Sequence, residues 1–90
     1  MIHLLKTDPE VFHRIATKEK TFELRKDDRH FQVDDHLILL ETVHTGKEMK
    51  EGKPLIYTGA ALPFHVPYIL RGPAYGLEDG WVILSIKPIE

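Results

Sequence analysis

A short charged segment, residues 20–31 (KTFELRKDDRHF), holds the side chains of this sequence that are best suited to chemistry. Its first half alternates polar and apolar residues, as a strand does when successive side chains point to opposite sides. We expect Phe22 and Leu24 to pack on one face of that strand. The other face would then carry a hydroxyl, a carboxylate and a guanidinium, from Thr21, Glu23 and Arg25.

Two chemical roles suit this polar face. Lys20 and Glu23 could act as an acid–base pair, because burial that lowers the pKa of a lysine lets its amine activate a nucleophile or polarise a carbonyl. Arg25 could hold a phosphate or a base edge through its planar fork, while Glu23 orients it or accepts an N–H from a ligand. The alternatives are a simple surface salt bridge between Glu23 and Arg25 and a solvated Lys20. The sequence does not decide between these chemical roles and their structural alternatives.

Two more residues could contact a ligand. Arg29 is the guanidinium of the loop that follows the strand, a loop otherwise typical of a charged turn in which Asp side chains bond the nearby backbone. Tyr75 lies beside glycines and could stack a base, whereas we expect Phe31 to lie in the core. The candidate ligand contacts are therefore Lys20, Thr21, Glu23, Arg25, Arg29 and Tyr75.

The sequence contains no pattern for a metal or a cofactor. It has no cysteine, and its six histidines are never spaced three to five residues apart as in local zinc motifs. The Gly-x-Ser-x-Gly elbow, the P-loop and the Gly-x-Gly-x-x-Gly fingerprint do not occur. We expect neither a metal ion nor a cofactor.

Length and composition predict one ordinary domain over residues 1–90. The hydrophobic fraction of 42% and charged fraction of 29% are close to those of globular proteins. A net charge of −2 leaves room for a small basic site but not for a long groove that follows many phosphates. No apolar run approaches the roughly 20 residues of a membrane span, and the first residues do not read as a secretory signal. We expect a cytoplasmic monomer.

Local patterns predict five strands and one helix. The helix would begin either with a Thr7-x-x-Glu10 capping box or with Asp8 as N-cap and Pro9 as its first residue. Residues 44–54 should form the longest exposed loop, 57–59 a turn, and 71–80 a connection rich in glycine. The predicted helix spans residues 8–16, and the predicted strands span 2–6, 21–26, 36–43, 62–70 and 81–87.

These elements indicate an α+β fold. A sheet this small would curl into a partly closed barrel to protect its edges. In the last strand, Val82, Leu84 and Ile86 should face the core together.

Several motifs along the chain carry a resemblance to a known family. They are His3-x-Leu5-Lys6, KTFELRKDDRHFQV, Tyr57-Thr58-Gly59, Tyr68-Ile69-Leu70, Tyr75-Gly76-Leu77 and the closing GWVILSI. The sequence resembles an uncharacterised family of small phage and bacterial proteins placed among the ASCH domains, which are similar to the PUA fold. The resemblance implies a small five-stranded mixed β-barrel with one N-terminal α-helix, and a cleft associated with RNA or modified nucleosides.

A related ASCH group, the N4-acetylcytidine amidohydrolases, carries the pattern Gly-x-Lys-Thr-x-Thr-x-Arg on the corresponding strand. This sequence retains Lys20, Thr21 and Arg25, but Glu23 stands where that group has its second threonine. By position, Glu78 is a candidate for the distal glutamate of that group.

We therefore expect an RNA- or nucleoside-binding protein with a charged cleft. One alternative is a hydrolase of acylated modified nucleosides, or a ribonuclease, with Lys20 and Glu23 as catalytic residues. Another is a phage accessory protein that binds a host protein through exposed apolar residues at 62–64.

Overall fold

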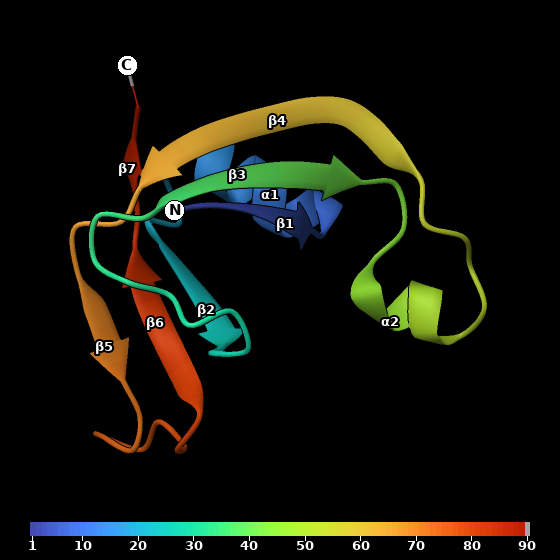
Figure 1. Ribbon diagram of the computed structural model, residues 1–90. Helices are drawn as coiled ribbons and strands as arrows, with labels where there is room; N and C mark the ends of the chain where they lie inside the picture. Colours follow the sequence, from blue (N-terminus) through green and yellow to red (C-terminus); the bar gives the residue numbers. More distant parts are fainter. Residues whose placement is uncertain (90) are drawn as a thin grey trace.

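The computed structural model describes residues 1–89, which form an α+β fold of two small sheets and two short helices. Figure 1 shows the two sheets lying across each other, with α1 against the sheet that contains β1, β3 and β4. The strand orders are β1-β3-β4-β7 and β2-β6-β5. The strands are β1 (Ile2–Thr7), β2 (Phe22–Lys26), β3 (His36–Thr42), β4 (Tyr57–His65), β5 (Ile69–Arg71), β6 (Trp81–Ser85) and β7 (Lys87–Pro88); the helices are α1 (Pro9–Ala16) and α2 (Gly46–Lys50).

The α+β class is confirmed, but the five-stranded barrel is wrong. Residues 1–89 form seven strands in two separate sheets. The predicted strand 62–70 covers the end of β4 and the first two residues of β5, and the predicted strand 81–87 covers β6 and the first residue of β7. Each pair belongs to different sheets, so the chain crosses from one sheet to the other at buried Val66 and again at buried Ile86. The hydrophobic pattern of an apolar segment is the same whether the segment stays in one sheet or continues into another.

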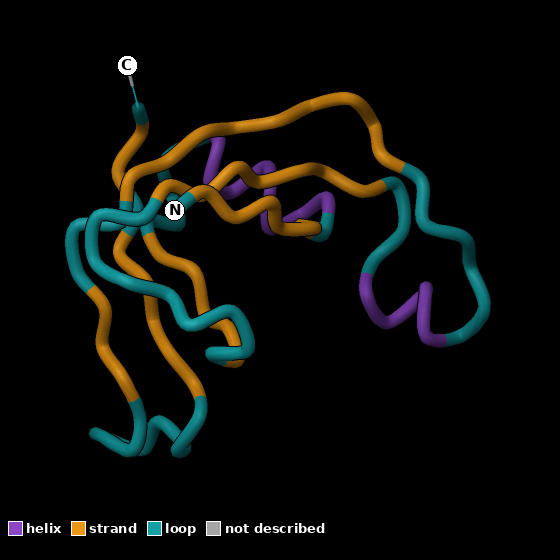
Figure 2. The backbone as a smooth tube through the Cα atoms, in the orientation of Figure 1, coloured by secondary structure: helices purple, strands orange, loops and turns teal. Residues whose placement is uncertain are grey.

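The segment 44–54, predicted to be a loop, contains α2. A capping box starts this helix: the Thr45 hydroxyl accepts the Glu48 N–H at 3.0 Å, and the Glu48 carboxylate accepts the Thr45 N–H at 2.9 Å. The hydrogen bond from the Thr45 backbone also holds the pKa of Glu48 below its usual value. Residues 51–60 are exposed, although 57–59 begin β4 instead of forming a turn. Figure 2 shows α2 and the loops on either side of it extending away from the two sheets.

The start of α1 follows the second of the two predicted arrangements. Asp8 is the N-cap and Pro9 is the first helical residue. The Thr7 capping box does not form, because the Thr7 hydroxyl donates to the Leu5 carbonyl at 3.2 Å. The Asp8 carboxylate instead accepts the Gly46 N–H at 2.9 Å, which ties α2 to the junction of β1 and α1.

No helix among residues 1–89 is long and apolar enough to cross a membrane.

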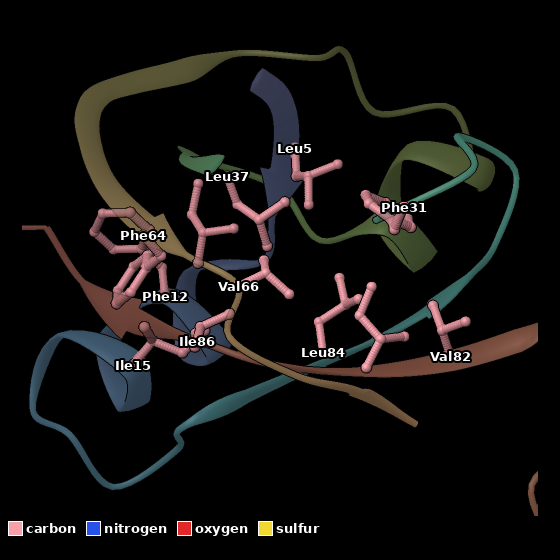
Figure 3. Close-up of a cluster of buried hydrophobic side chains, with 12 residues drawn as sticks. Leu5, Phe12, Ile15, Phe31, Leu37, Phe64, Val66, Val82, Leu84 and Ile86 are labelled. Carbon is pink, nitrogen blue, oxygen red and sulfur yellow. The ribbon is translucent and has the colours of Figure 1, made fainter. Parts of the chain in front are cut away.

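One hydrophobic core lies between the two sheets and α1. Its members are Leu5, Phe12, Ile15, Phe31, Leu37, Leu39, Phe64, Val66, Ile69, Val82, Leu84 and Ile86. The predicted inward direction of the last strand and the burial of Phe31 are confirmed. The predicted apolar contact surface at 62–64 is wrong, because Phe64 belongs to the core and Leu62 packs against it. Figure 3 shows Phe12, Ile15 and Phe64 gathered at one end of the core.

Candidate functional site

Strand β2 turns its charged side chains toward the inside of the protein. Glu23 pairs with Leu84 and Arg25 pairs with Val82 across the antiparallel β2–β6 ladder. Residues directly opposite each other in such a ladder point to the same side of the sheet, and Leu84 and Val82 belong to the core. The carboxylate of Glu23 is consequently buried, with 3% of the residue exposed.

The predicted alternation of β2 is therefore correct, but its assignment of faces is wrong. Phe22 and Leu24, expected to pack, are 43% and 49% exposed on the outer face. The Lys20 ammonium lies 4.8 Å from the centre of the Phe22 ring, a cation–π contact that partly covers the exposed aromatic ring.

Glu23 is neutralised by two cations that come from either side of it in the sequence. Lys20 Nζ lies 3.3 Å from its Oε1, and Arg25 Nε donates to its Oε2 at 2.9 Å. A buried carboxylate requires such partners, since an unpaired charge away from water is costly. The side chains of Lys20 and Arg25 are 25% and 28% exposed, so each cation is held by Glu23 while still reaching solvent.

Arginine side chains, not a ladder of backbone hydrogen bonds, connect β2 and its loop to β1. Arg25 Nη2 donates to the Lys6 carbonyl at 2.9 Å, and Arg29 Nη1 donates to the Leu4 carbonyl at 2.8 Å. Leu4 and Lys6 are two residues apart on an edge strand, so their carbonyls point to the same open edge. These bridges leave space between the sheets. Among residues 1–89, Nη1 of Arg25 has no hydrogen-bond partner.

The loop after β2 is held in place by Asp27. Its Oδ1 accepts the Phe31 N–H at 2.9 Å, and its Oδ2 lies 2.6 Å from Nη1 of Arg71. The guanidinium of Arg71 also donates to the Phe31 carbonyl. This agrees with the expectation of an Asp-stabilised turn and shows that Arg71 holds the loop through Nη1 and Nη2.

Three adjoining cavities of about 250, 460 and 430 Å³ meet at Lys6 and Arg25. We call them together the charged hollow. Its lining has more positive than negative side chains, although the whole chain has a net charge of −2. The cations are Lys6, Lys20, Arg25, Lys26, Arg29 and Lys50, and the carboxylates are Asp8, Glu23 and Asp28.

The structure brings together part of the predicted site. Lys20, Glu23 and Arg25 line one cavity of the hollow, and Arg29 lines its neighbour. Thr21 lines a different cavity, which it shares with Lys20.

Two other predicted residues lie outside the hollow. Tyr75 is 97% exposed and lines neither the charged hollow nor the cavities that contain Thr21 and Glu78. Glu78 lines a separate, mainly apolar cavity beside Leu24 and Trp81.

Sequence reasoning missed the contribution of β1 and α2 to the hollow. Lys6, Thr7 and Asp8 occupy the junction where β1 ends and α1 begins, and Lys50 lies on α2. β1 pairs with β3 in parallel, so the ends of both strands lie at the same edge of the sheet. The signal that was available is the Thr45-x-x-Glu48 capping box, which marks a helix directly after β3.

A second buried carboxylate, Asp35, lies outside every cavity described above. It accepts the Gln32 N–H at 2.9 Å, and its oxygens lie 2.8 Å from His3 Nε2 and 3.1 Å from the Met1 α-amino group. Burial alone would raise the pKa of Asp35. The Gln32 N–H, His3 and the α-amino group outweigh burial, so the pKa lies below its ordinary value.

Three of the six histidines, His3, His44 and His65, each lie within 4 Å of a single acid. His3 contacts Asp35, and His65 Nε2 lies 2.8 Å from Asp34 Oδ1. In the part of the chain that the structure describes, no three His, Cys, Asp or Glu side chains are grouped as a metal site would require.

No protein with a curated function matches the sequence. The charged hollow is lined by residues of β1, β2, α2, β6 and the segments between β1 and β3, all between Leu5 and Trp81. These elements fall within residues 2–86, which match the family model described as a domain of unknown function (DUF3850), and the chain therefore belongs to that family.

Proposed function

We propose that this protein binds RNA or a nucleoside-sized ligand in the charged hollow. The observation that carries the proposal is the convergence of Lys20 and Arg25 on buried Glu23 at the mouth of a cavity. Each cation is positioned before a ligand arrives, which lowers the cost of ordering it on binding. The volumes of 250 to 460 Å³ suit a ligand about the size of one nucleotide.

Arg25 is the central contact of the proposed site. Its Nε and Nη2 are engaged by Glu23 and the Lys6 carbonyl, which fixes the plane of the guanidinium. The two N–H groups on Nη1 can then donate to a phosphate or to a base edge. Lys6 and Lys20 add positive charge on either side of it.

Glu23 has a supporting role in this arrangement. Both of its oxygens already accept from cations, so it orients Lys20 and Arg25 and leaves one remaining lone pair on each oxygen for a ligand N–H.

A relationship to the ASCH domains and their PUA-like fold is part of the same proposal, as are a monomeric state and a cytoplasmic location.

The test is titration of a short single-stranded RNA against wild type and Arg25→Ala. Loss of one charge-assisted contact should weaken binding by about tenfold or more. Arg14→Ala is the matched control, because Arg14 has the same charge but pairs with Glu10 and Glu19 on the outside of α1. Equal affinity of wild type and Arg25→Ala, or equal losses in both variants, would remove the hollow as the binding site. Circular dichroism of each variant checks that it is folded.

A hydrolase is the second candidate, favoured by the Lys20–Glu23 pair. An amine 3.3 Å from a buried carboxylate at a cavity wall has the geometry of an acid–base pair. The pair would activate water to attack an acyl carbon on a modified nucleoside, releasing a carboxylic acid and the free amine. The same pair could serve RNA cleavage. Chromatography of acylated nucleosides after incubation decides between binding and turnover. Turnover that survives in Lys20→Ala would exclude this pair as the catalyst.

A further inference from the structure

Beside the charged hollow lies a second cavity of about 390 Å³ with a different character. We call it the lysine cavity. Lys18, Lys20 and Lys87 line it together with Thr21. Its remaining lining is apolar, from Ile15, Phe64, Ile86 and Pro88, the first three belonging to the end of the core visible in Figure 3.

No carboxylate of residues 1–89 lines the lysine cavity. Glu19, which lies between two of the lysines in sequence, points elsewhere. Its Oε2 is 2.7 Å from Arg14 and its Oε1 accepts from the Thr17 hydroxyl at 2.9 Å. Among residues 1–89, Lys18 and Lys87 therefore have no carboxylate partner, whereas Lys20 is paired with Glu23.

The backbone at the end of α1 places Lys18 at this cavity. The Lys18 N–H donates to the Ile15 carbonyl at 3.0 Å, and the Glu19 N–H donates to the Arg14 carbonyl at 2.9 Å. This is the Schellman motif, in which the residue after the C-cap is usually glycine because it adopts a left-handed conformation. Lys18 occupies that position with φ 66°, so the chain carries a cation where a glycine would be less strained.

Lys20 belongs to both sites. Its ammonium contacts Glu23 in the charged hollow, and its side chain also lines the lysine cavity. The two sites are thus neighbours separated by one side chain, and cations continue from Lys6 and Arg25 through Lys20 to Lys18 and Lys87.

We infer that the lysine cavity holds the next nucleotide of an RNA strand whose first nucleotide occupies the charged hollow. The ligand is then an oligonucleotide of at least two nucleotides and not a free nucleoside. Lys18 and Lys87 contact its phosphate, Thr21 can bond a sugar hydroxyl or a base edge, and the sugar or base lies on the apolar lining. This inference rests on the proposed function and extends it.

The experiment compares a nucleoside 5′-monophosphate with a single-stranded RNA tetranucleotide, each titrated against wild type, Lys18→Gly and Lys87→Ala at several salt concentrations. Wild type should bind the tetranucleotide more tightly. Each substitution should weaken tetranucleotide binding several-fold and reduce the slope of log K against log salt by about 0.7, as expected for one lost phosphate contact on a single strand. Monophosphate binding should stay unchanged.

Lys18→Gly is the most informative variant because glycine suits the left-handed position, so loss of folding cannot account for weaker binding. Lys53→Ala is the matched control, since Lys53 is exposed and lines none of the five cavities. If both ligands bind wild type equally, or if Lys18→Gly and Lys87→Ala bind the tetranucleotide as wild type does, the inference is overturned while the hollow remains a binding site. If wild type binds neither ligand, the proposed function itself fails.

Discussion

Glu23 and Asp35 are both buried carboxylates with positively charged or N–H partners, yet their surroundings differ. Only 3% of Glu23 and 5% of Asp35 is exposed. His3, a partner of Asp35, is equally buried, whereas the Met1 α-amino group is exposed, and neither Asp35 nor His3 lines any of the cavities named above. The partners of Glu23 are each about a quarter exposed, and they line the charged hollow. Burial and pairing alone thus do not distinguish a ligand site from a structural contact; access for a ligand does.

Substitutions at Asp35 and at Glu23 should also differ in their effect on the free energy of unfolding. When Asp35 loses an acceptor oxygen, the buried His3 ring loses its partner and cannot turn to water, which is costly. When an open group loses its acceptor, the cations can turn toward water in the hollow. We therefore expect substitutions at Asp35 to act on folding and those around Glu23 to act mainly on binding.

The largest effect is expected for Asp35→Asn. An asparagine has one acceptor oxygen and presents an amide N–H₂ to groups that are themselves donors, from Gln32, His3 and the α-amino group. We expect the free energy of unfolding to fall by about 3 kcal/mol, measured by urea denaturation. The folded variant should bind RNA as wild type does. A loss of less than about 0.5 kcal/mol would show that this closed network is not required for folding.

Acid should have the next largest effect, again through Asp35. Its pKa is lower in the folded protein than the ordinary 3.8, so the unfolded chain takes up a proton first as the pH falls. The stabilisation from this group is complete above the ordinary pKa and is lost as the pH falls through the folded pKa. Denaturation curves at pH 7 and pH 3 should show a larger loss for wild type than for Asp35→Asn. Equal losses would mean that other acids account for the pH dependence.

A smaller effect on stability is expected for Glu23→Gln. The glutamine keeps the shape and one acceptor, and both Lys20 and Arg25 can become hydrated in the hollow. We expect the free energy of unfolding to fall by about 1 kcal/mol, clearly less than for Asp35→Asn. Urea denaturation of the two variants side by side measures the difference. A loss at Glu23 as large as that at Asp35 would show that the hollow is not open enough to solvate its cations.

The smallest effect is expected for Tyr75→Ala. Its side chain is 97% exposed and lines neither the charged hollow nor the lysine cavity. Stability should change by no more than about 0.5 kcal/mol, and RNA affinity should not change. Fluorescence titration of RNA against this variant checks the point. A marked loss of affinity would support the base-stacking role predicted for Tyr75 from the sequence and would extend the site beyond the hollow.

Much of the fold was accessible from the sequence because it depends on local patterns. The α+β class, the Asp8–Pro9 start of α1, the inward direction of Val82 and Leu84, and the core position of Phe31 follow from spacing, capping and apolar character. The segment with the candidate site was also recognisable, because Lys20, Glu23 and Arg25 are concentrated charges on an alternating strand.

The remaining features of the fold and the site depend on which segments of the chain contact one another in the folded protein. The division of two apolar runs between sheets, the contribution of β1 and α2 to the hollow, and the closed surroundings of Asp35 all arise from contacts between residues far apart in the sequence.

The orientation of β2 shows most clearly why local sequence patterns do not determine tertiary contacts. A period of two establishes that the faces of a strand differ, but it does not say which face meets the core. The sequence by itself determined that β2 has one charged and one apolar face. Pairing of Glu23 with Leu84 and of Arg25 with Val82 turned the charged face inward, and only the tertiary structure could decide that.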